Sequence, residues 1–289
     1  MEPRVAAITV TYDRPDHLSR LLESLRDQTR PVDAVIVVDN SSRDDVTAVA
    51  AAHAEVTLLR ERDNSGPAGG FARGMTFAFA EGYDWFLLIG DDDRLAVPDA
   101  VRILLDRAAS SEHPVMVGSS LVRGREVWPA GGWWKHRPVM AFAHPPRSAE
   151  YDVDVTTFSG LLVPRAVFDD VGAPWAELFM SWEDYDFCLR ARDRGHRIVI
   201  LDRPLVEFQA EREIGNYAPW RAYYQARNSL LVLRRRRVPI EFVWWLLFQL
   251  KSLLVSVTLD RPAARIAMRL RGIVHGLRGR TGRVVDPSA

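Results

Sequence analysis

Residues 85–93 read Trp-Phe-Leu-Leu-Ile-Gly-Asp-Asp-Asp, an apolar run that ends in three consecutive carboxylates. The apolar run predicts a buried strand that ends at Gly90. Ligands of α/β proteins bind beyond the carboxyl ends of strands, so Asp91, Asp92 and Asp93 stand where a site is expected. Adjacent acids repel one another unless a cation lies among them, and their oxygens suit Mg²⁺ or Mn²⁺. A solvated acidic turn before the next helix is the alternative.

The residues around this stretch alternate between strand-like and helix-like patterns. Residues 5–10, 34–38 and 56–59 are short apolar runs, and leucines at helical spacing follow Pro15. Such alternation predicts an α/β fold with a doubly wound, mostly parallel sheet and helices on both faces.

Two earlier strands also end in polar residues. Thr11 and Asp13 follow the first, and Asp39 follows the second. Their side chains should project toward the same sheet edge as the acids at 91–93, which is what a nucleotide site needs. An acid there accepts hydrogen bonds from a ribose or a base edge. For Asp39, a turn that caps the next helix is the alternative.

Residues 64–74, Asn-Ser-Gly-Pro-Ala-Gly-Gly-Phe-Ala-Arg-Gly, form a glycine-rich entry to a helix. Glycines allow a backbone to approach a ligand closely, and a helix N-terminus favours anions. The candidates here are Asn64, Gly69, Gly70 and Arg73. The spacing matches neither a Walker loop nor a G-x-G-x-x-G motif, so a simple turn is also compatible.

A second acidic group lies at residues 182–186, Trp-Glu-Asp-Tyr-Asp, at the start of a predicted helix. Acids there stabilise the helix dipole, which needs only one or two of them. A carboxylate placed against Trp182 acquires a raised pKa and can serve as a general base, with Asp184 and Glu183 as candidates. Upstream, Trp128, Trp133, Trp134 and His136 would form either a sugar-stacking platform or ordinary core.

Charge divides the chain of 289 residues unevenly. Residues 219–289 hold 14 Lys/Arg and 3 Asp/Glu, a net charge of +11 in a chain of formal charge zero. This asymmetry predicts an anionic partner. The single cysteine, Cys188, excludes an intramolecular disulfide. The first residues lack the pattern of a secretory leader, so we expect the cytosol or the cytosolic face of a membrane.

Within the basic region, residues 240–257 are strongly apolar but include Glu241 and Lys251. We expect an interfacial helix that lies on an anionic leaflet, with an oligomer contact or a core helix as alternatives. The predicted division is an α/β domain with the nucleotide site at 1–218, a helical extension at 219–277 and a disordered tail at 278–289.

Taken together, these motifs resemble the family 2 inverting glycosyltransferases of GT-A fold over roughly residues 4–235. The resemblance rests on Val-Thr-Tyr-Asp-Arg-Pro, Val-Val-Asp-Asn-Ser-Ser, the glycine-rich segment, Asp-Asp-Asp and Trp-Glu-Asp. Asp-Asp-Asp, Trp-Glu-Asp and the later Tyr-Tyr-x-x-Arg-Asn at 223–228 together are most similar to actinobacterial galactofuranosyltransferases of cell-wall galactan synthesis, particularly the initiating type. Rhamnosyltransferases of the same pathway are the close alternative.

The resemblance implies a nucleoside-diphosphate sugar donor and no nucleic acid. Asp91 and Asp93 would hold a divalent metal, Mg²⁺ or Mn²⁺, with Asp92 nearer the sugar, while Asp184 or Glu183 would deprotonate the acceptor. The other donor-binding residues it implies are Thr11, Asp13, Asp39, Asn64, Gly69, Gly70, Arg73 and Trp182. The basic, apolar C-terminal region adds a polyprenyl-diphosphate-linked saccharide at the membrane surface as the expected acceptor.

One feature departs from the family. Its members usually carry a histidine metal ligand after the last strand, whereas residues 204–211 here contain none, which leaves Glu207 or Gln209 as oxygen ligands. A catalytically inactive sugar-nucleotide-binding protein therefore stays an alternative. A nucleotidyltransferase is another, although it would need a glycine-rich basic loop where this chain has Thr11-Tyr12-Asp13.

Overall fold

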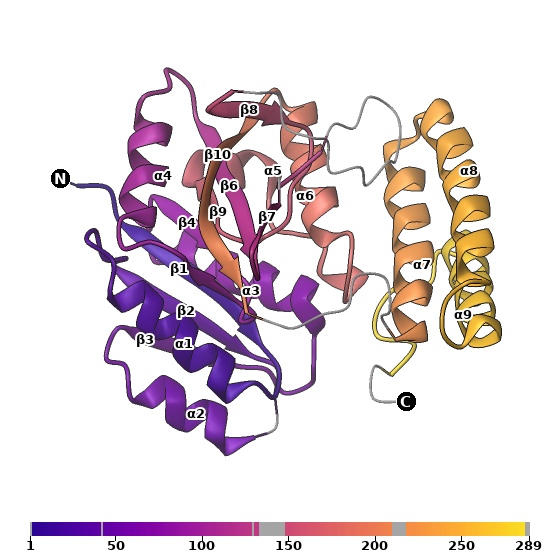
Figure 1. Ribbon diagram of the computed structural model, residues 1–289, viewed down its shortest axis with the longest axis horizontal. Helices are drawn as coiled ribbons and strands as arrows, with labels where there is room; N and C mark the ends of the chain where they lie inside the picture. Colours follow the sequence, from indigo (N-terminus) through magenta and orange to yellow (C-terminus); the bar gives the residue numbers. More distant parts are fainter. Residues whose placement is uncertain (1, 42, 129, 133–147, 210–217, 287–289) are drawn as a thin grey trace.

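A computed structural model describes residues 2–41, 43–128, 130–132, 148–209 and 218–286 of the chain. Figure 1 shows a twisted sheet flanked by helices, with the C-terminal helices packed side by side at one end of the molecule. The residues Trp133, Trp134 and His136, suggested as a stacking platform, lie outside the described ranges.

The first half alternates strands and helices as predicted. The elements are β1 (Val5–Thr11), α1 (Pro15–Arg26), β2 (Ala34–Asp39), α2 (Asp44–Ala51), β3 (Val56–Arg60), α3 (Gly66–Ala80) and β4 (Trp85–Leu88). β1 pairs in parallel with both β2 and β4, and β2 pairs in parallel with β3. The register places Thr11 beside Asp39, so the polar strand ends share one edge.

The second half turns the sheet into a mixed one. It contains β5 (Asp93–Leu95), α4 (Ala100–Ala109), β6 (Val115–Arg123), β7 (Glu126–Trp128), β8 (Glu150–Val153), β9 (Leu161–Pro164), α5 (Arg165–Val171), a 3₁₀ turn (Ala176–Leu178), α6 (Glu183–Asp193) and β10 (Arg197–Phe208). The main strand order is β3-β2-β1-β4-β9-β6-β10-β5. β9 runs antiparallel to β4 and β6.

Two apolar layers hold the helices to the sheet, because successive strand residues face opposite sides. Ile8 and Phe86 belong to the layer that contains α3 and α6, whereas Val37 and Leu87 belong to the layer that contains α1 and α4. All four side chains are fully buried. Both faces of the sheet are therefore covered, so ligands gain access at the carboxyl ends of the strands.

The C-terminal helices are α7 (Pro219–Arg236), α8 (Pro239–Ser256) and α9 (Pro262–Leu277), and α7 lies between the sheet and the outer pair (Figure 1). Glycines bring α9 close to α7, because a Cβ on Gly272 would lie 2.4 Å from the Tyr223 carbonyl oxygen. Arg236 donates to both carboxylate oxygens of the buried Glu241, at 2.9 Å each, which fixes the turn between α7 and α8.

Two expectations need correction. The apolar run Ile198–Leu201 predicts the last strand, but this strand continues as β10 to Phe208. Its register shifts on both sides of Pro204, which has no backbone N–H to donate. Residues 278–286 of the predicted disordered tail are folded against α7. There, Tyr224 Oη donates to the Val285 carbonyl at 2.7 Å, and Val285 is buried.

Candidate active site

The two acidic groups, about 90 residues apart in sequence, line one cavity of about 570 Å³ at the carboxyl ends of β1 and β4. Asp91, Asp92 and Asp93 form part of its wall, and Glu183 and Asp184 form another part. Acids from two distant parts of the sequence therefore face a common space.

Thr11 and Asp91 meet because β1 and β4 are adjacent and parallel. Thr11 Oγ1 donates to Asp91 Oδ2 at 3.0 Å. Arg14, just before α1, contacts Asp91 Oδ1 at 3.1 Å and Asp92 Oδ2 at 3.3 Å. Burial, reinforced by the charge of Asp92, raises the pKa of Asp91 to about 6, although Arg14 and Thr11 oppose the rise.

Asp93 is the most deeply buried of the three acids. Burial and the charge of Asp92 raise its pKa well above the ordinary value, and Oδ1 has no hydrogen-bond partner. A buried carboxylate with an unpartnered oxygen next to a second carboxylate is a donor set that suits a hard divalent cation. In the described ranges, no three His, Cys, Asp or Glu side chains converge into a metal site, so further oxygens must come from other groups.

Gln209 and Glu207 stand where the family resemblance leads us to expect a histidine. Glu207 is engaged by Arg94, whose Nη2 donates to Oε2 at 2.7 Å. Gln209 Nε2 donates to the Asp93 carbonyl at 2.7 Å, and its Oε1 is buried without a hydrogen-bond partner. Gln209 Oε1 is therefore a buried oxygen without a partner, whereas Glu207 is engaged by Arg94 through Oε2.

Glu183 and Asp184 begin α6 and face the cavity. Burial and the neighbouring Asp184 raise the pKa of Glu183 well above its usual range, and its Oε2 is unpartnered. Burial raises the pKa of Asp184 to about 7, while the Tyr185 backbone N–H donates to Oδ1 at 2.8 Å. A pKa of about 7 lets Asp184 gain and lose a proton near neutral pH, which is what a general base requires.

The segment before these acids is strained. In residues 178–182, which we call the acid loop, Phe179, Ser181 and Trp182 have φ angles of 64°, 67° and 79°. Positive φ costs a non-glycine residue about 1–3 kcal/mol. Trp182 is buried as the residue preceding α6, and its ring lies 5.5 Å from that of Tyr185 rather than against the cavity.

The glycine-rich segment contributes to the site through Gly66, which the sequence did not single out. Gly66 has φ +69°, and a Cβ there would lie 2.0 Å from the Phe179 carbonyl oxygen, so this entry to α3 abuts the acid loop. Gly70 lies inside α3, where a Cβ would meet Val10 at 2.5 Å; it permits close helix–sheet packing. Gly69 likewise faces Ser65.

Four other predicted residues occupy varied positions. Asn64 lines the cavity, and its Oδ1 accepts from the Gly66 N–H at 2.8 Å. Asp39 is buried and accepts from the Ser41 N–H at 2.8 Å, which is the turn given above as the alternative. Asp13 is exposed in the left-handed region, and Arg73 donates to Glu61 at 2.7 Å outside the cavity.

Several cavity residues were not predicted. Arg14 and Asn40 stand beside predicted residues, so their strand-end positions were a usable signal. Trp220, Arg283 and Asp286 come from the C-terminal region, and nothing local in the sequence places them at the strand ends.

Comparison with known proteins agrees with this geometry. Residues 6–172 match the family described as "Glycosyl transferase family 2". The chain therefore belongs to glycosyltransferase family 2.

Its relatives include galactofuranosyltransferases. It is 27% identical to GlfT2 of Mycobacterium tuberculosis over 80% of this chain and 41% of that protein, so it spans about two fifths of GlfT2. It is 39% identical to GlfT1 of Mycolicibacterium smegmatis over 63% of each chain. The dTDP-rhamnosyl transferase RfbF of Shigella flexneri is 23% identical over 98% of each chain.

Solved structures show the same GT-A fold. The mannosyltransferase PcManGT of Pyrobaculum calidifontis, in complex with GDP-Man and Mn²⁺, matches with a TM-score of 0.61 and 14% identity over 97% of this chain and 88% of that one. GalNAc-T7 with UDP, GalNAc and Mn²⁺ also gives a TM-score of 0.61, at 12% identity over 80% of this chain and 48% of that one.

Proposed function

We propose that this glycosyltransferase moves a hexose, galactofuranose by preference, from a nucleoside-diphosphate sugar to a hydroxyl of a polyprenyl-diphosphate-linked saccharide, with inversion at the anomeric carbon. The observation that carries the proposal is the shared cavity of Asp91–Asp93 and Glu183–Asp184. The similarity to GlfT1 and GlfT2 supports the sugar.

Asp184 is the general base of the proposed reaction. Its carboxylate takes the acceptor hydroxyl proton as that oxygen bonds to the anomeric carbon and the bond to the diphosphate breaks. Burial and the charge of Asp184 raise the pKa of Glu183, which favours the protonated form of Glu183 beside an Asp184 carboxylate. A positioned base contributes about 10²–10⁴-fold to the rate.

The residues of the opposite wall bind the donor. Thr11, Asn40 and Asn64 line the part of the cavity nearest β1 and β2, where we place the nucleoside. Asp91 and Asp93 would hold the divalent cation, with Gln209 Oε1 as the additional protein oxygen. When bound, the cation would neutralise the leaving diphosphate.

A rhamnosyltransferase is the second candidate, favoured by the end-to-end match with RfbF. The family assignment leaves no support for a nucleotidyltransferase.

Thermal shift and turnover with Mn²⁺ distinguish the two donors. UDP-galactofuranose and dTDP-rhamnose are compared, each with an EDTA control. We expect UDP-galactofuranose to raise the Tm and to release UDP, since saturation 100-fold over Kd stabilises a protein by about 2.7 kcal/mol. Preference for dTDP-rhamnose would replace the sugar assignment, and binding without turnover in every case would indicate an inactive relative.

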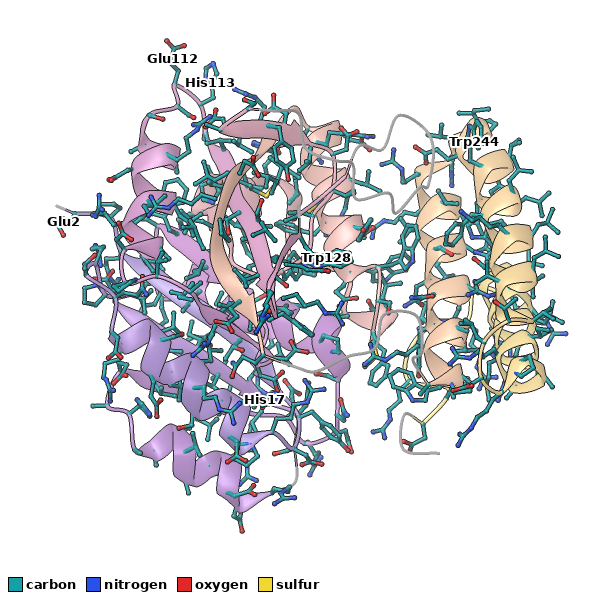
Figure 2. The ribbon with its side chains drawn as sticks, in the orientation of Figure 1. Glu2, His17, Glu112, His113, Trp128 and Trp244 are labelled. Atoms are coloured by element: carbon teal, nitrogen blue, oxygen red, sulfur yellow. The ribbon has the colours of Figure 1, made fainter. Side chains whose placement is uncertain are left out.

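We also propose that α8 and α9 dock on the anionic cytosolic leaflet. Of the fourteen exposed large apolar side chains in the described residues, twelve lie on these helices or at their ends. Trp244, labelled in Figure 2, lies on α8 away from the sheet. Lys251, Arg261, Arg271 and Arg278 are exposed on the same helices, so the apolar surface carries a cationic surround.

By length and composition α8 could cross a bilayer, and 22% of its apolar window is buried. We favour a surface location because its buried residues Glu241, Trp245 and Gln249 bond to other C-terminal helices. Gln249 Oε1, for example, accepts from Arg269 at 2.9 Å.

Vesicle flotation tests this surface. The wild type should float with phosphatidylglycerol vesicles and much less with phosphatidylcholine vesicles, and Leu246→Glu with Leu250→Glu should abolish flotation. Val127→Glu, an exposed apolar residue outside α8 and α9, is the control. Unchanged flotation of the double variant would overturn the membrane assignment. A concentration-dependent dimer of the wild type that the double substitution dissociates would do the same.

A further inference from the structure

Arg227 and Asn228 of α7 are fully buried, do not line the cavity, and each donate to the acid loop. The Asn228 amide nitrogen lies 2.9 Å from the Leu178 carbonyl oxygen, 2.7 Å from that of Met180 and 2.8 Å from that of Ser181. Its two hydrogens are therefore shared among three acceptors, which gather the loop around one point.

Arg227 supports this arrangement from three directions. Its Nε donates to Asn228 Oδ1 at 2.7 Å, which orients the amide, and its Nη2 donates to the Leu178 carbonyl at 2.8 Å. Its Nη1 donates to the Gly282 carbonyl at 2.6 Å, and the Gly282 N–H donates to the Glu177 carbonyl at 2.7 Å. The guanidinium also lies 4.8 Å from the Tyr224 ring centroid.

The acid loop needs such support because of its backbone. Positive φ at Phe179, Ser181 and Trp182 is unfavourable in an isolated chain, and such strain persists only where the surroundings hold it. The loop is fixed on its other side by α3, where the Ala68 N–H donates to the Phe179 carbonyl at 3.1 Å. It ends directly at Glu183 and Asp184, so its conformation sets where these carboxylates project.

We propose that Arg227 and Asn228 are positioning residues that clamp the acid loop and so hold the Glu183–Asp184 pair in its catalytic orientation. The proposal rests on the proposed function of Asp184 as the base. It assigns a role to the Tyr-Tyr-x-x-Arg-Asn segment, whose side chains lie behind the cavity wall. It also predicts that donor nucleotide binding does not depend on Arg227 and Asn228, because Thr11 and Asp91, on the other side of the cavity, are held by their own hydrogen bond between β1 and β4.

The test compares Asn228→Ala and Arg227→Lys with Ser229→Ala. Ser229 is the next residue of α7, but its Oγ accepts from Trp245 Nε1 at 2.8 Å and does not touch the acid loop. Ser229→Ala therefore removes a buried hydrogen bond of the same helix without loosening the acids. For each folded variant we would measure the Tm, the Kd of UDP with Mn²⁺ and the kcat of donor turnover.

We expect kcat to fall about 10²-fold in Asn228→Ala and Arg227→Lys, the scale of a small misplacement of catalytic groups, with the Kd of UDP within twofold of the wild type. Ser229→Ala should keep its kcat. In a background that carries Ser181→Gly, Asn228→Ala should lower kcat by a smaller factor than it does in the wild type. The reason is that glycine adopts positive φ without strain, so the loop depends less on Asn228.

Wild-type kcat in both clamp variants, or equal losses in all three variants, would overturn the positioning role. A Kd for UDP that rises in step with the loss of kcat would do the same. If Asp184→Asn is itself fully active, the proposed base fails, whereas an inactive Asp184→Asn beside active clamp variants refutes only the clamp.

Discussion

The raised pKa of Asp184 links catalysis to stability, and Asp184→Asn separates the two. The pKa in the folded chain is about 7, above the ordinary value of 3.8, because the carboxylate is removed from water. The unfolded chain therefore loses this proton more readily than the folded one. Below pH 4 the group does not penalise folding, and as the pH rises through about 7 its full cost is reached.

The size of this cost follows from the two pKa values. At about 1.36 kcal/mol per pH unit, the interval from 3.8 to about 7 corresponds to ~4 kcal/mol. Asp184 is only partly buried and lines the cavity, where water reduces the penalty, so we take about half, ~2 kcal/mol. For a chain of this size, that is roughly 4–8 °C in Tm.

We therefore expect Asp184→Asn to lower donor turnover by about 10²–10⁴-fold and to raise the Tm by several degrees at pH 8. The gain at pH 5 should be smaller, because a larger part of the folded wild type is then protonated at Asp184. Wild-type turnover should rise with pH through about 7. Thermal unfolding in EDTA without donor measures the stability, with the exposed Asp27→Asn as control.

The reasoning would be refuted if Asp184→Asn had a lower Tm than the wild type at pH 8, or if it raised the Tm equally at both pH values. Either result would show that the ionised Asp184 side chain does not destabilise the folded chain. Turnover within a few-fold of the wild type would remove it as the base, whatever the Tm.

Three further outcomes are expected. Gly66→Ala should lower the free energy of unfolding by about 2 kcal/mol or more in a urea titration, because a Cβ would meet the Phe179 carbonyl at a positive φ; an unchanged midpoint would contradict this close approach. Asp91→Asn should weaken Mn²⁺ binding at least about tenfold in isothermal titration calorimetry, because it removes a charged ligand, and unchanged affinity would exclude Asp91 as a ligand. Tyr224→Phe should release the segment around Val285, lowering stability by about 1–3 kcal/mol and exposing it to limited proteolysis, whereas wild-type resistance would show that the bond does not hold it.

The sheet, and the side of the cavity that contains Thr11 and Asp91, could be predicted from the sequence because they depend on local patterns. Apolar runs in alternation with helical segments indicate parallel strands, and the carboxyl ends of neighbouring parallel strands must share an edge. The contact of Thr11 with Asp91 follows from that rule alone. Asp184 was recognisable because its neighbours in sequence are also acids at a helix start.

The support of the acid loop was not accessible in this way. Positive φ at Phe179, Ser181 and Trp182 carries no glycine or asparagine signal, since the conformation is imposed by Asn228, 46 or more residues away. The role of two glycines was also not predictable from local sequence. Gly69 and Gly70 have the composition of a phosphate loop, but their missing side chains permit packing onto Ser65 and Val10.

The C-terminal region is part of the active site as well as the proposed membrane surface. Gly276 of α9 lets this helix pack on the Arg227 carbonyl, with a Cβ distance of 3.0 Å, and Arg227 holds both the acid loop and Gly282. Beyond Gly282, Arg283 and Asp286 reach the cavity wall. A chain cut after α7 would lose the proposed membrane surface, the packing of α7 and part of the cavity together. Substitutions on the exposed faces of α8 and α9, such as Leu246→Glu, are therefore needed to test the proposed membrane binding separately from catalysis.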